Sequence, residues 1–150
     1  MKTIIIYDSM YGSTEKIAKA IAGAFPPGDV QVFRAGETDS IPQDTGLLVI
    51  GSPTQGGRQT KPLQDFMDKV LTSPTNNTKF AVFDTRLANK LVVIFGYAAQ
   101  RIADALKKKG ITLILPPERF IVKGAKGPLK EGELERAAAW GKELAKIVVG

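Results

Sequence analysis

Cysteine and histidine are both absent from the 150 residues of this chain. Without cysteine there can be no disulfide, thiolate nucleophile or cysteine-ligated metal, and without histidine the commonest base and metal ligand is missing. Chemistry must then come from carboxylates, hydroxyls, lysine or a bound cofactor, and a cofactor is the economical source of redox chemistry. Because cysteine and histidine supply most metal ligands, we predict no metal site.

Long hydrophobic runs are absent too. No apolar stretch approaches the roughly eighteen residues that a membrane span needs, and the apolar run near the N-terminus is too short for a signal peptide. Hydrophobic residues make up 43% of the chain and charged residues 24%, a balance that is typical of globular proteins. We expect one domain over residues 1–150, a cytoplasmic location and no contact with a membrane.

Acidic residues are the minority, with 15 Asp and Glu against 21 Lys and Arg, which gives a formal net charge of +6. Such a charge invites a nucleic-acid interpretation. The basic residues are spread over predicted helix faces and over the helix end at Lys107, Lys108 and Lys109, where cations complement the helix dipole. Because no basic stripe is interleaved with aromatic residues, we predict no nucleic-acid partner.

Apolar segments alternate with helical patterns along the chain. The predicted strands cover residues 2–7, 30–33, 46–51, 79–83 and 111–115, and the predicted helices cover 13–25, 61–71, 97–109 and 131–148. This order predicts an α/β fold, a doubly wound five-stranded parallel sheet with helices on both faces.

Two segments are harder to assign. Residues 91–95 fit either an extended segment or the lead-in to a helix, and residues 120–122 could extend the pairing of the fifth strand. The glycine-containing loop that follows them is predicted to be structural, not a second anion site.

The first predicted strand runs into a loop rich in hydroxyl groups. Ser9, Ser13 and Thr14 supply hydroxyl donors, and Gly12 lets the backbone approach a ligand oxygen closely. A helical pattern begins directly after the loop, and the N-terminus of a helix attracts phosphate through unpaired N–H groups and its dipole. The alternative is that Ser13 merely caps this helix. Neither a G-x-G-x-x-G motif nor a P-loop motif is present.

This stretch resembles the flavodoxin signature, in the form Ile5-Ile6-Tyr7-x-Ser9-x-x-Gly12-x-Thr14 with Ala18 and Ile21 behind it. In flavodoxins the loop wraps the phosphate of flavin mononucleotide (FMN), and the resemblance implies FMN as the cofactor here. The residues to which it assigns the phosphate are Ser9, Met10, Tyr11, Gly12, Ser13 and Thr14. The chain is most similar to short-chain flavodoxins, because it lacks the insertion in the fifth strand.

A second distinctive loop follows the third predicted strand and reads Ser52-Pro53-Thr54-Gln55-Gly56-Gly57-Arg58. Ligands of open parallel sheets bind beyond the carboxyl ends of the strands, where this loop is expected. From spacing alone, an ordinary glycine turn is an equal alternative. The loop resembles the Ser-Pro-Thr-x-Gly-Gly loop of flavodoxins, which implies that it borders the flavin ring. The residues assigned by this resemblance are Pro53, Thr54, Gln55, Gly56 and Gly57.

A third candidate segment follows the fourth predicted strand. Asp84, Thr85 and Arg86 are expected just past the strand end, and Tyr97 opens the next predicted helix. We predict that backbone N–H groups and a hydroxyl of this segment reach the pyrimidine edge of the flavin. The alternative is that Asp84 and Arg86 pair with each other on the surface, worth under about 1 kcal/mol. Trp140, the only tryptophan, lies within a predicted helix and is expected in the core.

These features and the resemblance together predict an FMN-binding electron-transfer protein that shuttles electrons between redox partners. The flavin is then the reactive centre, and we predict no catalytic side chain. The alternatives are an FMN-dependent oxidoreductase acting on a small substrate such as a quinone, and a non-redox module of the same fold that binds another phosphate ligand. Arg58, Lys61 and Arg86 stand in or beside the two loops expected at the ring. Because these are cations, we expect acidic docking faces on the redox protein partners, and we expect a monomer or a weak dimer.

Overall fold

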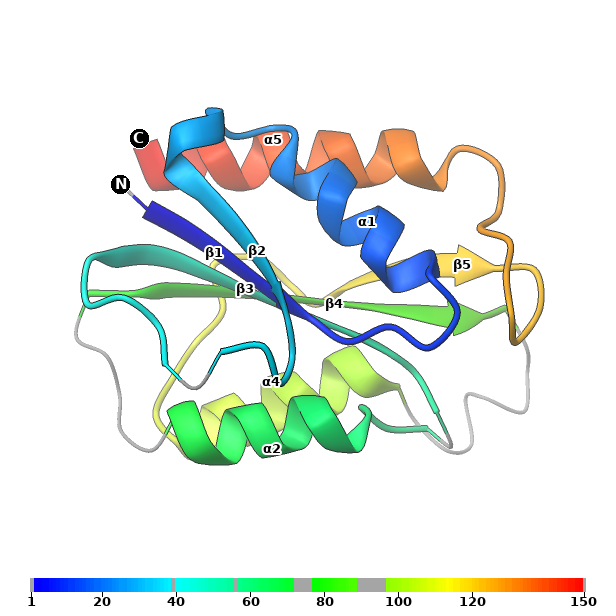
Figure 1. The fold of residues 1–150 in the computed structure, drawn as a ribbon, viewed down its shortest axis with the longest axis horizontal. Helices are drawn as coiled ribbons and strands as arrows, with labels where there is room; N and C mark the ends of the chain where they lie inside the picture. The colour runs from blue at the N-terminus through cyan, green and yellow to red at the C-terminus, as the bar shows by residue number, and fades with distance from the viewer. Residues whose placement is uncertain (1, 39, 56, 72–76, 89–96, 150) are drawn as a thin grey trace.

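The computed structural model describes residues 2–38, 40–55, 57–71, 77–88 and 97–149. At its centre lies a five-stranded parallel sheet with the strand order β2-β1-β3-β4-β5 (Figure 1). The strands are β1 Lys2–Tyr7, β2 Val30–Arg34, β3 Thr45–Pro53, β4 Lys79–Leu87 and β5 Glu118–Val122. The α/β fold predicted from the sequence, a doubly wound five-stranded parallel sheet, is confirmed.

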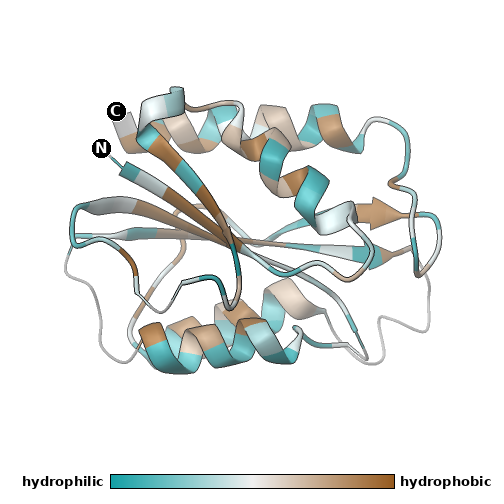
Figure 2. Cartoon of the chain, viewed as in Figure 1, coloured by the Kyte–Doolittle hydropathy of each residue, from teal (hydrophilic) through white to brown (hydrophobic). Residues whose placement is uncertain are grey.

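Helices cover both faces of the sheet (Figure 1). On one face lie α1 Ser13–Ala22 and α5 Glu133–Val149, and on the other lie α2 Lys61–Val70 and α4 Ala98–Lys108. A short 3-10 helix, η1 Pro27–Asp29, precedes β2. Figure 2 shows largely hydrophobic strands between helices that are part hydrophobic and part hydrophilic, as expected where each helix buries only one side.

The core is divided into two clusters by the sheet. Ile4 faces the α2 and α4 side while Ile5 faces the α1 and α5 side, because successive side chains of a strand point to opposite faces. On the second side Trp140 is 5% exposed, and its ring packs edge-on against Phe83 at 6.1 Å and Phe120 at 6.3 Å between centroids. The core position predicted for the tryptophan is therefore confirmed.

The prediction of the fifth strand at residues 111–115 is wrong, because that segment forms only an isolated bridge between Leu113 and Phe80. The strand that pairs with β4 is β5, in which Phe120 and Val122 are buried and their neighbours are not. The apolar character of 111–115 is explained by packing, since Ile111 belongs to one core cluster with Leu113 packed against it, and Ile114 and Leu115 pack against the other. In an edge strand with one buried face, apolar and polar residues alternate instead, so its mean hydropathy is lower and it is harder to find in the sequence. The expectation that 120–122 takes part in pairing is confirmed.

The remaining assignments differ only at their boundaries. The first helix ends at Ala22 and the last helix begins at Glu133, just after Gly132 with a φ of 86°. The segment predicted at 91–95 lies outside the described residues. Within the described ranges, no helix combines the length and the apolar character that crossing a bilayer requires.

Candidate functional site

The segments at the carboxyl ends of β1, β3 and β4 meet at one edge of the sheet, on the right in Figure 1. They surround a pocket of about 260 Å³. The pocket is lined by Ser9, Met10, Tyr11, Ser13, Thr14, Pro53, Thr54, Gln55, Thr85, Arg86, Leu87, Val122 and Ala125. Open parallel sheets bind their ligands at this edge, so the pocket is the candidate site.

The first loop ends in an uncapped helix. Gly12 is the N-cap of α1 with a φ of 99°, and no side chain makes a capping hydrogen bond. Ser13 is the first helical residue, so the alternative in which it caps the helix is wrong. The N–H of Gly12 donates to the Ser9 hydroxyl at 3.0 Å, which folds the loop back on itself. The loop therefore presents the positive end of the helix dipole to the pocket.

Two buried threonines connect the first loop to β4. The hydroxyl oxygens of Thr14 and Thr85 lie 2.7 Å apart, and the two residues are 1% and 4% exposed. One hydroxyl donates to the other, so the accepting hydroxyl keeps its own proton for a further acceptor. Since both residues line the pocket, an oxygen atom of a ligand is the acceptor that this pair is suited to meet.

Arg34 holds the first loop from the neighbouring strand. It is the last residue of β2 and is in register with Tyr7, directly before the loop. Its Nε lies 3.4 Å from the Asp8 carboxylate, and its Nη2 donates to the carbonyl of Ser9. The sequence analysis missed this residue. The signal that could have found it is the parallel pairing of β1 with β2, which brings the two strand ends together.

Tyr7 and Glu15 form a second support beneath the loop. The Tyr7 hydroxyl donates to the Glu15 carboxylate at 2.8 Å. Burial, together with this hydrogen bond, raises the pKa of Tyr7 from 10.0 to about 12. The carboxylate of Glu15 also lies 3.8 Å from the Nζ of Lys19, which stands four residues later in the last turn of α1. Because Glu15 has donors of its own, its charge is partly compensated close to the anion-binding end of the helix.

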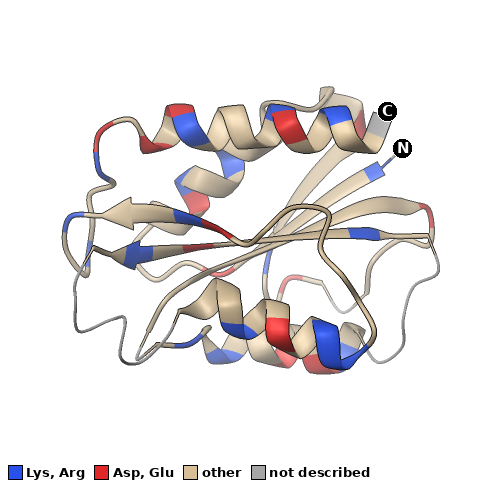
Figure 3. Cartoon of the chain, turned by 180° about the vertical axis from the view of Figure 1, so that it is seen from behind, with Lys and Arg blue, Asp and Glu red and all other residues tan. Residues whose placement is uncertain are grey.

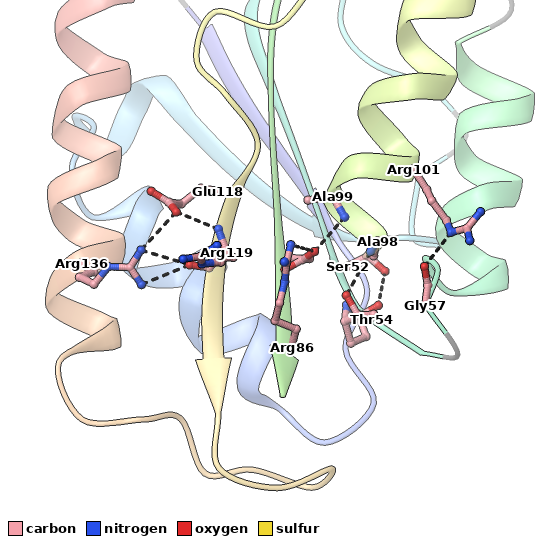
Figure 4. Close-up of polar contacts among 12 residues, drawn as sticks. Ser52, Thr54, Gly57, Arg86, Ala98, Ala99, Arg101, Glu118, Arg119 and Arg136 are labelled. Atoms are coloured by element: carbon pink, nitrogen blue, oxygen red, sulfur yellow. Dashed lines mark hydrogen bonds and ion pairs between the residues drawn. The ribbon is translucent and has the colours of Figure 1, made fainter. Parts of the chain in front are cut away.

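The second loop is fixed by hydrogen bonds to β4 and α4. The N–H of Thr54 donates to the Thr85 carbonyl at 2.8 Å, and the Thr54 hydroxyl accepts from the N–H of Ala98 at 3.1 Å (Figure 4). Gln55 and Arg58 bond each other through both main-chain groups and so close a tight turn. Gly57 within it has a φ of 80°, a left-handed value that side chains other than glycine rarely adopt. These hydrogen bonds hold Thr54 and Gln55 at the rim of the pocket, which both residues line.

The third segment lies within β4, not beyond its end as predicted. Asp84 is fully buried, and its carboxylate accepts from Arg86 at 2.8 and 2.6 Å and from the N–H of Ala99 at 2.9 Å. Figure 4 labels the two donor residues, Arg86 and Ala99. The guanidinium carbon of Arg86 stands 3.4 Å from the ring centroid of Tyr97, a cation–π arrangement. The pair expected on the surface as the alternative does form, but it is buried. Asp84 fastens the N-terminus of α4 and does not line the pocket.

The loop after β5 closes the remaining side of the pocket, and the sequence analysis missed its contribution. Val122 and Ala125 line the pocket, as does Leu87 from β4. A Cβ at Gly127 would lie 3.0 Å from the Ser13 hydroxyl, so this loop packs directly on the start of α1. Small and apolar side chains of this kind carry no sequence signal for a ligand, because they read as core or turn residues.

Most predicted site residues thus come together around one pocket. Ser9, Met10, Tyr11, Ser13, Thr14, Pro53, Thr54, Gln55, Thr85 and Arg86 line it. Gly12, Gly57, Asp84 and Tyr97 shape or support it without lining it. Gly56 lies outside the described residues.

Comparison with known proteins agrees with this geometry. A family model described as flavodoxin matches residues 5–140. An uncharacterized protein of Methanocaldococcus jannaschii is 30% identical over 97% of this chain, and a putative diflavin flavoprotein of Nostoc is 34% identical over 53% of it. The chain spans only 36% and 15% of the lengths of these two relatives.

Solved structures show the same fold at lower identity. A flavodoxin from the domain Archaea has a TM-score of 0.78 at 24% identity, with both chains fully covered. Flavodoxin 1 from Bacillus cereus has a TM-score of 0.79 at 22% identity, over 97% of this chain and 98% of its own. The rubredoxin oxygen:oxidoreductase of Desulfovibrio gigas matches over 36% of its length, with a TM-score of 0.75 at 20% identity. With the family model spanning most of the sequence, the chain belongs to the flavodoxin family, whose members carry FMN.

Proposed function

We propose that the pocket binds FMN through the first loop and that the protein carries electrons between redox proteins. The observation that carries this proposal is the uncapped N-terminus of α1, which opens into a pocket together with the Thr14 and Thr85 hydroxyls. The negative charge of a phosphate monoester is stabilised by the helix dipole, and its oxygens accept hydrogen bonds from the hydroxyls. The absence of a Lys or Arg within residues 9–15 means that the phosphate would be held mainly by dipoles.

The residues present fit the two ends of FMN. Hydroxyls and the helix end would hold the phosphate, with Ser9, Ser13 and Thr14 contributed by the first loop. The rest of the lining includes the apolar side chains of Pro53, Leu87 and Val122, which suit a flat aromatic ring. Bound there, the flavin supplies one-electron and two-electron chemistry that no side chain of this protein can supply.

The described lining favours a carrier over an enzyme. Among the residues that line the pocket there is no carboxylate, and histidine is absent from the chain. Arg86 is the one charged lining residue, and it is paired with Asp84. The residues of this site are therefore suited to bind, orient and shield the flavin, while the described lining offers hydroxyls but no carboxylate, lysine or histidine for general acid–base work on a second substrate.

The test is an analysis of the purified protein. Acid treatment should release FMN at one molecule per chain, and the reduced protein should pass electrons one at a time to a ferric haem protein. A different flavin, or none, would contradict the binding proposal. Multiple turnovers of NADH with a quinone, faster than with free FMN, would instead favour the oxidoreductase alternative.

A further inference from the structure

A basic groove lies between α2 and α4, on the sheet face opposite α1 and α5. Its volume is about 570 Å³, and we refer to it as the α2–α4 groove. Its lining residues are Arg58, Gln59, Lys61, Gln64, Arg101, Asp104, Ala105 and Lys108. Four of these carry positive charge and one carries negative charge, so the groove is cationic.

The groove is built from the exposed stripes of its two helices. Arg101, Asp104 and Lys108 recur at spacings of three and four residues on α4, which places them on one side of that helix. Lys61 opens α2 and lies 3.2 Å from Asp65, in an exposed pair worth at most about 1 kcal/mol that another carboxylate can replace. Blue and red bands alternate on these two helices in Figure 3.

The groove adjoins the loop that lines the flavin pocket. The Nε of Arg101 donates to the carbonyl of Gly57 at 2.7 Å, and the N–H of Ala98 donates to the Thr54 hydroxyl at 3.1 Å (Figure 4). Thr54 lines the flavin pocket, while Arg58, four residues later, lines the groove. One short turn therefore has the pocket on one side and the groove on the other.

The three cations predicted to lie near the flavin ring, Arg58, Lys61 and Arg86, are divided between the pocket and the α2–α4 groove. Arg86 lines the pocket, but its charge is compensated by Asp84 inside the protein. Arg58 and Lys61 line the groove as exposed side chains, although Lys61 shares its charge with the exposed Asp65. Long-range attraction of a charged partner is therefore exerted from the groove more than from the pocket itself.

We propose that the α2–α4 groove is the docking site for an acidic face of the electron-transfer partner. This inference rests on the proposed function, since docking beside the Pro53–Arg58 turn is useful only if the pocket holds a redox group. Charge complementarity steers encounter and sets orientation, and a partner seated in the groove lies against the turn that lines the pocket. Arg101 lines the groove and donates to the Gly57 carbonyl, so a partner bound in the groove would contact a residue that holds this turn.

Charge reversal in the groove tests the proposal. The variant Arg58→Glu with Lys108→Glu changes two exposed groove residues, and the main-chain bonds of Arg58 to Gln55 are kept. The matched control is Lys142→Glu with Lys146→Glu, two exposed positions of α5 on the opposite face. Both double variants lower the net charge by the same amount, so general surface charge affects both alike.

The first readout is binding, and it does not depend on the flavin. A fluorescein-labelled oligoglutamate peptide should bind the wild type, bind the groove variant about tenfold more weakly, and bind the α5 control as the wild type does. Equal weakening in both variants, or no binding to the wild type, would overturn the groove as the site. Tighter binding of a single-stranded oligonucleotide of equal charge, lost in the groove variant, would overturn the choice of a protein partner.

The second readout is the rate of electron transfer from the reduced, FMN-loaded protein. Each two-electron-reduced protein supplies one electron to each of two ferric haems, in the acidic cytochrome b5 or the basic cytochrome c. The rate with cytochrome b5 should fall as salt rises and fall about tenfold in the groove variant only. An unchanged rate in that variant overturns the docking proposal. If neither haem protein is reduced while the peptide still binds the groove, the proposed carrier function fails and the groove remains an acidic-protein site.

Discussion

Replacing Thr14 with valine removes one hydroxyl at the centre of the proposed phosphate site. Valine has nearly the same shape, so the packing of a residue that is 1% exposed is kept. The change removes the 2.7 Å bond to Thr85 and with it a proton that the pair can offer to a ligand. A hydrogen bond to a charged group contributes about 1.5–3 kcal/mol, which corresponds to a loss of FMN affinity of roughly ten- to one hundred-fold.

The measurement is a fluorescence titration of the apoprotein with FMN and with riboflavin. Thr14→Val should weaken FMN binding by the factor above and change riboflavin binding by much less, because only FMN carries the phosphate. The control is Thr45→Val, which removes a 2.6 Å hydrogen bond to the Pro42 carbonyl at the start of β3, the end of that strand remote from the pocket. This control should lower stability and leave both affinities unchanged. Equal losses for the two flavins would refute the placement of the phosphate at this hydroxyl pair.

Three further predictions concern stability, measured by urea unfolding of the apoprotein. The pKa of Tyr7 is raised to about 12 in the folded state, so its contribution to stability of about 2–3 kcal/mol is complete below pH 10 and is lost as pH rises toward 12. Tyr7→Phe should remove this part of the pH dependence. An unchanged slope of unfolding free energy against pH between about 10 and 12 would contradict it. Asp84→Asn leaves the buried Arg86 guanidinium without its counter-charge and should cost about 3–5 kcal/mol, whereas a cost under about 1 kcal/mol would show that the pair is effectively exposed. Gly141→Ala places a Cβ 2.7 Å from the carbonyl oxygen of Ile21, and it should lower the free energy of unfolding by about 1–3 kcal/mol because α1 and α5 are forced apart. A urea midpoint equal to that of the wild type would contradict this prediction.

The strand and helix pattern was predictable where burial leaves a clear trace in composition. β1 and β3 are buried on both faces and read as continuous apolar runs, which is why they were found with nearly correct boundaries. β5 lies at the sheet edge, and its alternating, partly charged sequence indicated only that it could extend a strand at residues 111–115. Hydropathy reports burial, and it does not report whether the buried segment makes ladder hydrogen bonds.

The candidate site was predictable to the extent that single residue types imply its chemistry. Hydroxyls and a glycine between a strand and a helix indicate an anion site, and the first loop has this form. The supporting residue Arg34 was missed because its role depends on which strand lies beside β1. The role of Asp84 was missed because the extra length of β4 turns its carboxylate toward α4, and strand length is set by tertiary pairing with β3 and β5.

The central claim is that the pocket between the first loop, the Pro53–Arg58 turn and the end of β4 holds FMN. A crystal structure of the protein grown with FMN tests it most directly. The account predicts the phosphate at the N-terminus of α1, within hydrogen-bond reach of the Thr14 and Thr85 hydroxyl pair, and the ring between the Pro53 side and the Leu87 side of the pocket. A flavin whose phosphate lies elsewhere, for example among the cations of the α2–α4 groove, would contradict it.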